Sequence, residues 1–227
     1  VALALVGATY ANGYVKNKVM EFVGPGVASL SADCRNGIDC MTTETTCWSS
    51  IWQTDGVTEE YLAGHGRADA YKELKPADVA YYDGCIELDL SKIECMIALP
   101  MHPSYAYPIR ELKANAKDLL HEIETRANEQ LSGKVKMDLV SKVRADGSIY
   151  VDQGIVAGCS GGTYENLCAV ADILRGKSCG NGEFKFSAYP DSMPTYLELV
   201  KNGVVADIVS AGAIIRECFC GPCFGAG

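Results

Sequence analysis

The chain lacks the features that would place it on nucleic acid or in a membrane. Its 227 residues carry 20 Lys and Arg against 29 Asp and Glu, a net charge of −9. It therefore has no basic footprint of the kind that binding to a phosphate backbone requires. Its longest apolar runs, residues 1–8 and 95–101, are far shorter than the roughly 20 residues of a membrane-spanning helix. We expect neither a nucleic-acid nor a membrane partner.

Histidine is scarce, and paired zinc-binding motifs are absent. The three histidines, His65, His102 and His121, are dispersed, and only one Cys-x-x-Cys occurs, which disfavours a zinc site. No basic segment followed by an apolar stretch and a cleavage site marks a secretory signal. What the chain does have is 11 cysteines. An odd number without a secretory signal argues for a reducing compartment, so we expect a cytoplasmic protein.

Most of these cysteines show no paired spacing. Because free cysteine behaves in a core as a small apolar side chain, we expect them to be buried and inert. They are Cys34, Cys40, Cys47, Cys85, Cys95, Cys168, Cys179 and Cys218.

Three cysteines differ from the rest. Cys159 lies in Ala-Gly-Cys-Ser-Gly-Gly, and Cys220 and Cys223 lie in Cys-Gly-Pro-Cys; each site follows an apolar, strand-like run and is rich in glycine. Three thiolates are one short of the usual ligand set of an electron-transfer cubane, and would leave one iron open to oxygen ligands. One Cys-x-x-Cys is also compatible with a redox pair, half a zinc site or two packed thiols. The redox pair is disfavoured because no helical pattern follows it.

The hydrophobic pattern predicts an α/β fold in two domains, residues 1–108 and 109–227. In the first we expect strands at residues 27–30, 79–82 and 95–99 and a helix at 57–63. Residues 111–131 have apolar side chains at three- and four-residue steps and predict one long helix that Gly133 ends.

After Gly147 the pattern alternates as in α/β units. We expect strands at residues 149–156, 184–188 and 211–215 and helices at 164–174 and 205–210; a further helix has Asp191 or Ser192 as its cap, Pro194 in its first turn and Gly203 past its end. Both cysteine sites then follow strands. Since ligands bind beyond the carboxyl ends of strands in open α/β sheets, the two sites can converge.

The order of these motifs resembles the aconitase superfamily of iron–sulfur hydro-lyases. Its members carry a Cys-Thr-Asn motif followed by Cys-Gly-Pro-Cys; here Gly-Cys-Ser-Gly at 158–161, Tyr-Glu-Asn at 164–166 and Cys-Gly-Pro-Cys at 220–223 occur in that order. Upstream, residues 21–27 are similar to a Gly-Pro-Gly-Val segment, residues 41–46 to Gly-Ala-Glu-Ile-Gly-Ala-Thr, and residues 65–69 to Gly-Arg-Ala-Asp. The resemblance covers the whole chain and is strongest to a divergent, aconitase-like hydratase branch.

The resemblance implies a three-layer fold with mostly parallel sheets and the family's second and third domains. It implies a [4Fe-4S] cluster on Cys159, Cys220 and Cys223, and a catalytic role for Glu44 near the open iron. A structural carboxylate in a Thr-rich loop is the alternative for Glu44. Gly161, Ser160 and Cys40 depart from the family's Asn, Thr and Asn, which bears on the substrate.

Family members are much longer, so we expect a fragment whose missing N- and C-terminal domains supply further catalytic groups. The expected activity of the parent protein is reversible dehydration of a small hydroxy-polycarboxylate, and we expect the fragment to be inactive by itself. Two alternatives stay open: a non-catalytic module that binds an iron–sulfur cluster or senses with it, and a relic of the fold without a cluster.

Overall fold

A computed structural model describes residues 1–180 and 182–226, and the chain divides into two compact units, Val1–Ser148 and Ile149–Gly227. The sequence predicted a division between residues 108 and 109. In the structure the helices that follow residue 108 belong to the first unit, since the next forty or so residues pack with the preceding elements rather than with the sheet of the second unit.

The first unit contains short helices and two two-stranded sheets. Strands β1 (Val19–Phe22) and β2 (Ser49–Trp52) pair in parallel, and β3 (Met96–Ala98) and β4 (Ala106–Pro108) pair antiparallel. The α-helices are α1 (Ala2–Thr9), α2 (Ala32–Thr42), α3 (Gly56–Gly64), α4 (Ile109–Ala114) and α5 (Ala116–Gln130). The 3-10 helices are η1 (Pro25–Ser29), η2 (Thr43–Thr45), η3 (Ala68–Ala70), η4 (Leu90–Lys92) and η5 (Val140–Lys142).

The helix predicted at residues 111–131 is present but broken. The backbone leaves the helical conformation at Asn115 (φ −128°, ψ 31°), which separates α4 from α5. The apolar positions still lie on one buried face, as the three- and four-residue spacing predicted: Leu112, Ala116, Leu120, Ile123 and Ala127 are buried.

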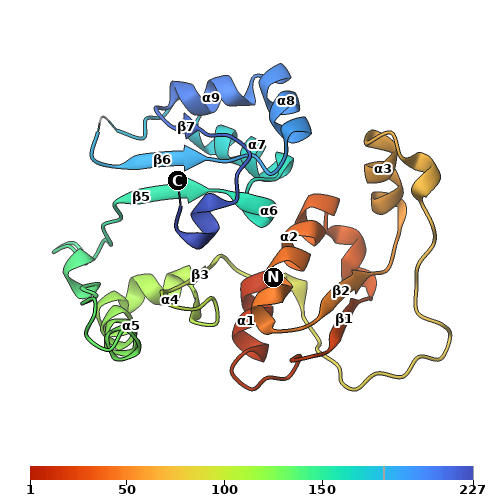
Figure 1. Cartoon of the computed structure of the whole chain (residues 1–227), viewed down its shortest axis with the longest axis horizontal. Coiled ribbons are helices and arrows are strands. Elements are labelled where there is room, and N and C mark those ends of the chain that lie inside the picture. Colours follow the sequence, from red (N-terminus) through yellow and green to blue (C-terminus); the bar gives the residue numbers. More distant parts are fainter. Residues whose placement is uncertain (181, 227) are drawn as a thin grey trace. The chain divides into compact units, whose positions relative to one another are not determined.

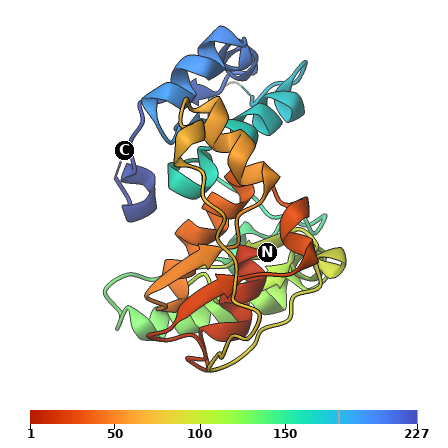
Figure 2. The ribbon, with the colours of Figure 1, turned by 90° about the vertical axis from the view of Figure 1, so that its right-hand side faces the viewer.

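Two predicted strands of the first unit are wrong. Residues 27–30 lie in and just after η1, which Pro25 initiates in place of a strand. Residues 79–82 lie in the segment 71–89 between η3 and η4, which contains no helix or strand. This segment runs along the first unit in an irregular, extended course (Figure 2). Side chains hold it in place: the Tyr14 hydroxyl accepts a hydrogen bond from the Cys85 amide at 3.1 Å, and the Tyr82 hydroxyl donates to Glu21 at 2.6 Å.

The second unit is a small α/β unit with a parallel sheet of order β5-β6-β7. Its strands are β5 (Gln153–Val156), β6 (Lys185–Ala188) and β7 (Ile214–Ile215), and its α-helices are α6 (Gly158–Gly161), α7 (Tyr164–Leu174), α8 (Met193–Lys201) and α9 (Val204–Ser210). A final 3-10 turn, η6, spans Gly221–Phe224. The predicted alternation is confirmed, and α/β with mostly parallel strands is the fold class.

Helices α7, α8 and α9 lie next to the sheet of the second unit (Figure 1), and their apolar side chains pack with it to form the core of that unit. Leu167 packs with Ala188 and Leu199, and Ala171 packs with Ile208 and Ala213. Within residues 1–180 and 182–226, no helix has both the length and the apolar character to cross a membrane.

Candidate functional site

Both cysteine turns lie beyond the same edge of the parallel sheet. Strands β5 and β7 flank β6 and run parallel to it, so their carboxyl ends meet at one edge. Cys159 follows the end of β5 by three residues, and the turn with Cys220 and Cys223 follows β7. The predicted position of the turns, after strands, is confirmed.

The Cys159 turn is a single helical turn that glycines make possible. Gly158 begins it with a φ of 77°, in the left-handed region that side chains disfavour. The turn closes with a hydrogen bond from the Gly162 amide to the Gly158 carbonyl at 2.8 Å. The Asn166 side chain of α7 donates to the Ser160 carbonyl at 3.0 Å. The Cys159 thiol is therefore presented, exposed, on a fixed turn.

The second turn is equally compact. The Cys223 amide donates to the Cys220 carbonyl at 3.2 Å, and the Ala226 amide donates to the Gly221 carbonyl at 2.8 Å. A side chain at Gly221 would meet the Phe219 ring at 2.1 Å, so glycine is required there. Both thiols of this turn are exposed.

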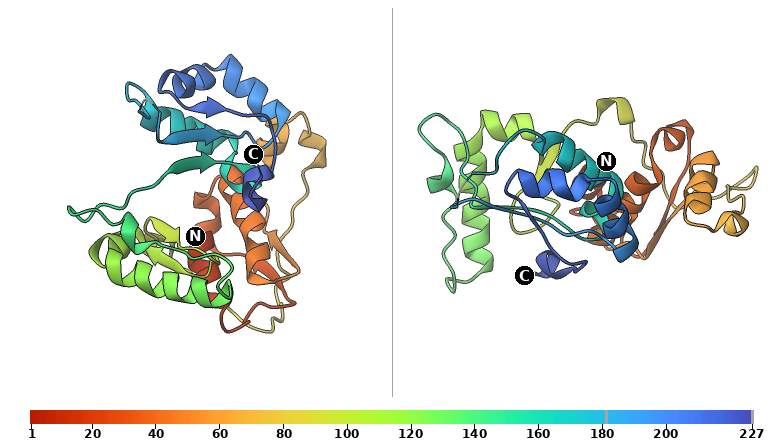
Figure 3. Two further views of the ribbon diagram at one scale, coloured as in Figure 1. Left: turned by 60° about the vertical axis from the view of Figure 1, so that its left-hand side comes forward. Right: turned by 90° about the horizontal axis from the view of Figure 1, so that it is seen from above.

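The two turns lie close together, with η6 near the end marked C and α6 beside it in Figure 1; Figure 3 gives two further views. A Cβ atom on Gly158 would lie 2.9 Å from the Cys223 sulfur, so that sulfur fills the space that glycine leaves beside Cys159. Partial desolvation raises the pKa of the Cys223 thiol. A hydrogen bond with Cys220 raises this pKa further, as do the charges that Cys220 and Cys159 would carry nearby. The Cys223 thiol is thus influenced by two other thiols, one of them more than 60 residues earlier in the chain.

The donor set of the two turns is suited by its chemistry to an iron–sulfur cluster. Across the residues that the structure describes, no three His, Cys, Asp or Glu side chains are grouped as ligands of one metal ion. Cys159, Cys220 and Cys223 supply thiols only, the ligands that iron–sulfur clusters use. The absence of a side chain at Gly158 lets the Cys223 sulfur approach the Cys159 turn.

The other cysteines are not buried, contrary to the prediction. Cys34, Cys85 and Cys95 are exposed, and the remaining five are half-buried. Their locations explain this: Cys85 and Cys95 lie on irregular segments, whereas Cys168 and Cys179 pack at the margin of the core of the second unit rather than inside it.

Glu44 belongs to the first unit, in η2, and its side chain is exposed. Among the described residues none forms a hydrogen bond or ion pair with its carboxylate. The cysteine site is built within the second unit alone, so the predicted role of Glu44 near the cluster stays a prediction.

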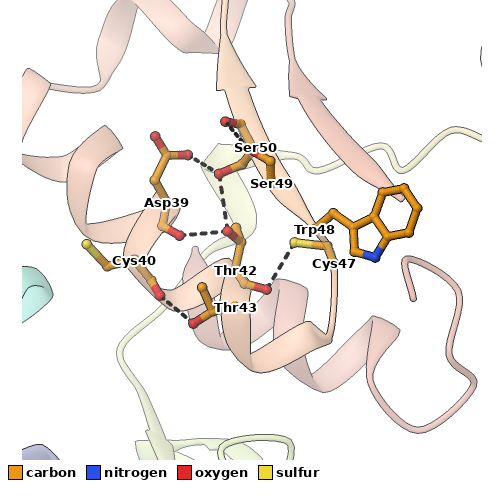
Figure 4. Close-up of a pocket in the computed structure, with 8 residues that line it drawn as sticks. All are labelled: Asp39, Cys40, Thr42, Thr43, Cys47, Trp48, Ser49 and Ser50. Carbon is orange, nitrogen blue, oxygen red and sulfur yellow. Dashed lines mark hydrogen bonds between the residues drawn. The ribbon is translucent and has the colours of Figure 1, made fainter. Parts of the chain in front are cut away.

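A pocket of about 350 Å³ that the sequence did not predict lies beside η2, the element that contains Glu44 (Figure 4). The Asp39 carboxylate accepts hydrogen bonds from the Ser50 hydroxyl at 2.5 Å and from the Trp52 indole at 2.7 Å. Among the pocket's lining residues, Cys40 departs from the family motif and Thr42 and Thr43 belong to the segment that resembles it, whereas no short motif marks Asp39 or Ser50. The lining comprises Asp39, Cys40, Thr42, Thr43, Cys47, Trp48, Ser49 and Ser50.

Fold and site together define an α/β protein in which two cysteine-bearing turns meet beyond the edge of a parallel sheet. A family model described as "Aconitase family (aconitate hydratase)" matches residues 1–227. The chain belongs to the aconitase family.

Curated relatives agree with the hydratase branch that the sequence predicted. The chain is 29% identical over 208 residues to a 3-isopropylmalate dehydratase large subunit of Clostridium beijerinckii and 30% identical over 206 residues to a 2,3-dimethylmalate dehydratase large subunit of Eubacterium barkeri. These matches cover 92% and 91% of the chain but 41% of each relative. A 3-isopropylmalate dehydratase large subunit of Clostridium kluyveri is 27% identical over 99% of the chain and 45% of its own length. The chain thus spans less than half the length of these relatives.

Proposed function

We propose that the chain is part of an aconitase-like hydro-lyase that reversibly dehydrates a small hydroxy-polycarboxylate, with a [4Fe-4S] cluster held by Cys159, Cys220 and Cys223. The observation that carries the proposal is the contact between the two cysteine turns, where the Cys223 sulfur lies 2.9 Å from the position of a Cβ on Gly158. Family membership supports the reaction class. The relatives are named for two substituted malates, which are hydroxy-dicarboxylates.

The three thiols and Glu44 have different roles in the proposed reaction. The three thiolates hold the cluster, which when bound supplies a Lewis-acidic iron that polarises a substrate oxygen. The Glu44 carboxyl group, which has no partner among the described residues, would donate a proton to the hydroxyl that leaves as water and would accept a proton from the water that adds in the reverse direction. The remaining domains of a longer polypeptide supply the other substrate contacts, and the protein acts in the cytoplasm.

Anaerobic reconstitution with iron and sulfide tests the cluster. We expect the wild-type chain to bind iron and sulfide and to develop the brown absorbance of a cluster, and Cys159→Ser to lose most of both. Cys95→Ser is the matched control, because Cys95 is an exposed thiol of the first unit, and it should behave as the wild type. A wild-type chain that takes up no iron would favour the relic without a cluster.

Activity separates the enzyme from the binding or sensing module. We expect the reconstituted 227-residue chain to be inactive, since positioning and acid–base groups outside it are needed. In a longer polypeptide that includes those regions, Glu44→Gln should keep the iron content and lower kcat by about 10²- to 10⁴-fold. Glu60→Gln, a change of an exposed carboxylate on α3, is the control. An intact cluster with no turnover of any hydroxyacid by the longer wild-type protein would favour the sensing module.

A further inference from the structure

Tyr189 is almost completely buried, yet its hydroxyl reaches solvent. The residue is 4% exposed, and none of the residues that the structure describes forms a hydrogen bond with its hydroxyl. Within that part of the chain, Thr163 is the residue whose side-chain oxygen is both enclosed and unpaired, so the unpaired oxygen of Tyr189 must be accessible. A buried tyrosine ring usually brings its hydroxyl to a hydrogen-bond partner. This one presents its hydroxyl to whatever binds from outside.

Arg216 offers an unpaired charge directly after strand β7. Its side chain is exposed, and no carboxylate of residues 1–180 or 182–226 forms an ion pair with it. In contrast, Arg35, Arg110, Arg126 and Arg175 each pair with a carboxylate. The guanidinium of Arg216 is therefore available to an anionic ligand.

The sheet places these two residues side by side. The Arg216 amide donates to the Ala188 carbonyl at 2.8 Å, and Ala188 pairs with Ile215. Tyr189 and Arg216 each follow one member of that pair, on strands about 4.8 Å apart. Ala188 and Ile215 pack with the core on the side of the helices. Because side chains alternate along a strand, and Pro190 keeps Tyr189 extended, both Tyr189 and Arg216 point to the opposite face.

Both residues adjoin the cysteine turns. A Cβ on Gly162 would lie 2.1 Å from the Tyr189 carbonyl oxygen, so the Cys159 turn rests against the backbone of Tyr189. Arg216 precedes Cys220 by four residues and leads into the second turn. Tyr189 and Arg216 therefore lie at the same edge of the sheet as the proposed cluster site.

We propose that the Tyr189 hydroxyl and the Arg216 guanidinium together bind one carboxylate of the substrate beside the cysteine turns. The inference rests on the proposed function, whose substrate is a small hydroxy-polycarboxylate. A guanidinium presents parallel N–H groups that match the two oxygens of a carboxylate, and the phenol donates one further hydrogen bond. Both are substrate-binding residues in this account, and neither is a ligand of the cluster.

The test measures malate affinity by isothermal titration calorimetry in the 227-residue chain, with the cluster and without it. Malate carries two carboxylates and a hydroxyl, and its uncharged dimethyl ester is the control ligand. Arg216→Gln should weaken malate binding about ten- to hundredfold and Tyr189→Phe about tenfold in both forms, because each change removes hydrogen bonds to a charged group. Arg110→Gln changes an exposed arginine of the first unit and should bind malate as the wild type does. Iron uptake should be the same in all of these proteins.

Weaker malate binding in both variants, together with poor binding of the ester by the wild type, would support the proposal. Wild-type affinity in either Arg216→Gln or Tyr189→Phe would overturn it. Equal binding of malate and its ester by the wild type, or no binding of malate, would also overturn it. Iron uptake reports on the cluster separately: a wild-type chain that takes up no iron would overturn the proposed cluster, whereas malate binding by the same chain would still decide whether Tyr189 and Arg216 hold a carboxylate.

Discussion

The two compact units bury polar side chains in different ways. In the first unit the buried polar side chains have hydrogen-bond partners within the chain. The Thr9 hydroxyl donates to the Leu5 carbonyl at 2.7 Å, and the Thr45 hydroxyl donates to the Thr42 carbonyl at 2.5 Å. In the second unit, Thr163 is buried without a partner. The difference is that the first unit satisfies its buried polar side chains within the chain, whereas the second leaves one buried hydroxyl unsatisfied.

Arg35 is the strongest example in the first unit. Its guanidinium is buried and donates to both carboxylate oxygens of Asp55, at 2.9 and 2.7 Å, and to the Val27 carbonyl at 2.8 Å, while its Nε donates to the Leu30 carbonyl at 3.1 Å. Asp55 also caps α3 by accepting from the Thr58 amide. One ion pair therefore joins α2, the start of α3 and the segment around η1.

The largest expected effect comes from removing one partner of this pair. Asp55→Ala should lower the free energy of unfolding by about 3–5 kcal/mol, because it leaves the Arg35 charge buried and unpaired. The double variant Arg35→Met/Asp55→Ala should recover part of the loss, since replacing both charges with apolar groups removes the unpaired charge. Urea denaturation checks both. A double variant less stable than Asp55→Ala would contradict the claim that the unpaired charge is the main cost.

The second comparison lies inside the cysteine turn, where two neighbouring glycines have different surroundings. A Cβ on Gly162 would lie 2.1 Å from the Tyr189 carbonyl oxygen, whereas a Cβ on Gly161 would have only ordinary contact, 3.9 Å from Val156. Gly162→Ala should therefore cost about 3 kcal/mol or more. Gly161→Ala is the matched control; it should be neutral or stabilise by up to about 1 kcal/mol through the unfolded chain. Equal stability of the two variants would mean that the turn is not packed as described.

Local patterns explain why the second unit was largely predictable. Helix α7 has the bounds that the sequence predicted, and the α8 cap at Ser192, with Pro194 in the first turn, could be inferred from residue types. The three cysteines stood out by their spacing and their glycines. In the first unit, β1 and β2 were missed, because β2 begins Ser-Ser and strand preference depends on neighbouring strands more than on the residue itself.

The orphaned hydroxyl of Thr163 could not be read from the sequence. A threonine before a helix predicts an ordinary cap, and the backbone of Thr163 (φ −65°, ψ 161°) matches that of Ser31 (φ −64°, ψ 163°), which does cap its helix, so the difference lies in the side chain alone. The Arg35–Asp55 pair was missed for a related reason: 20 residues separate the partners, and no periodic pattern links them.

Protonation of Asp55 at low pH should lower the free energy of unfolding, but by less than the replacement of Asp55 by Ala lowers it. The hydrogen bond from Arg35 is the main cause that holds the pKa of Asp55 below its ordinary value of 3.8. A carboxylate whose pKa is lower in the folded state stabilises the protein above the unfolded pKa, and this contribution is lost as the pH falls through the folded pKa. The stability difference between the wild type and Asp55→Ala should therefore be full near neutral pH and narrow below about pH 4. Urea denaturation across this range checks the prediction, which a constant difference would contradict.

The smallest effects concern the helix caps, and they sharpen the contrast with Thr163. Ser192 accepts a hydrogen bond from the Thr195 amide at the start of α8, and Ser31 accepts one from the Cys34 amide at the start of α2. Removing such a cap costs about 1 kcal/mol, so Ser192→Ala and Ser31→Ala should each lower the free energy of unfolding by that amount in the chain without a cluster. If the hydroxyl of Thr163 were an ordinary cap, Thr163→Val would show a loss of the same size under the same conditions. We expect Thr163→Val to raise the free energy of unfolding instead. The hydroxyls of Ser31 and Ser192 have hydrogen-bond partners within the chain, whereas the hydroxyl of Thr163 has none.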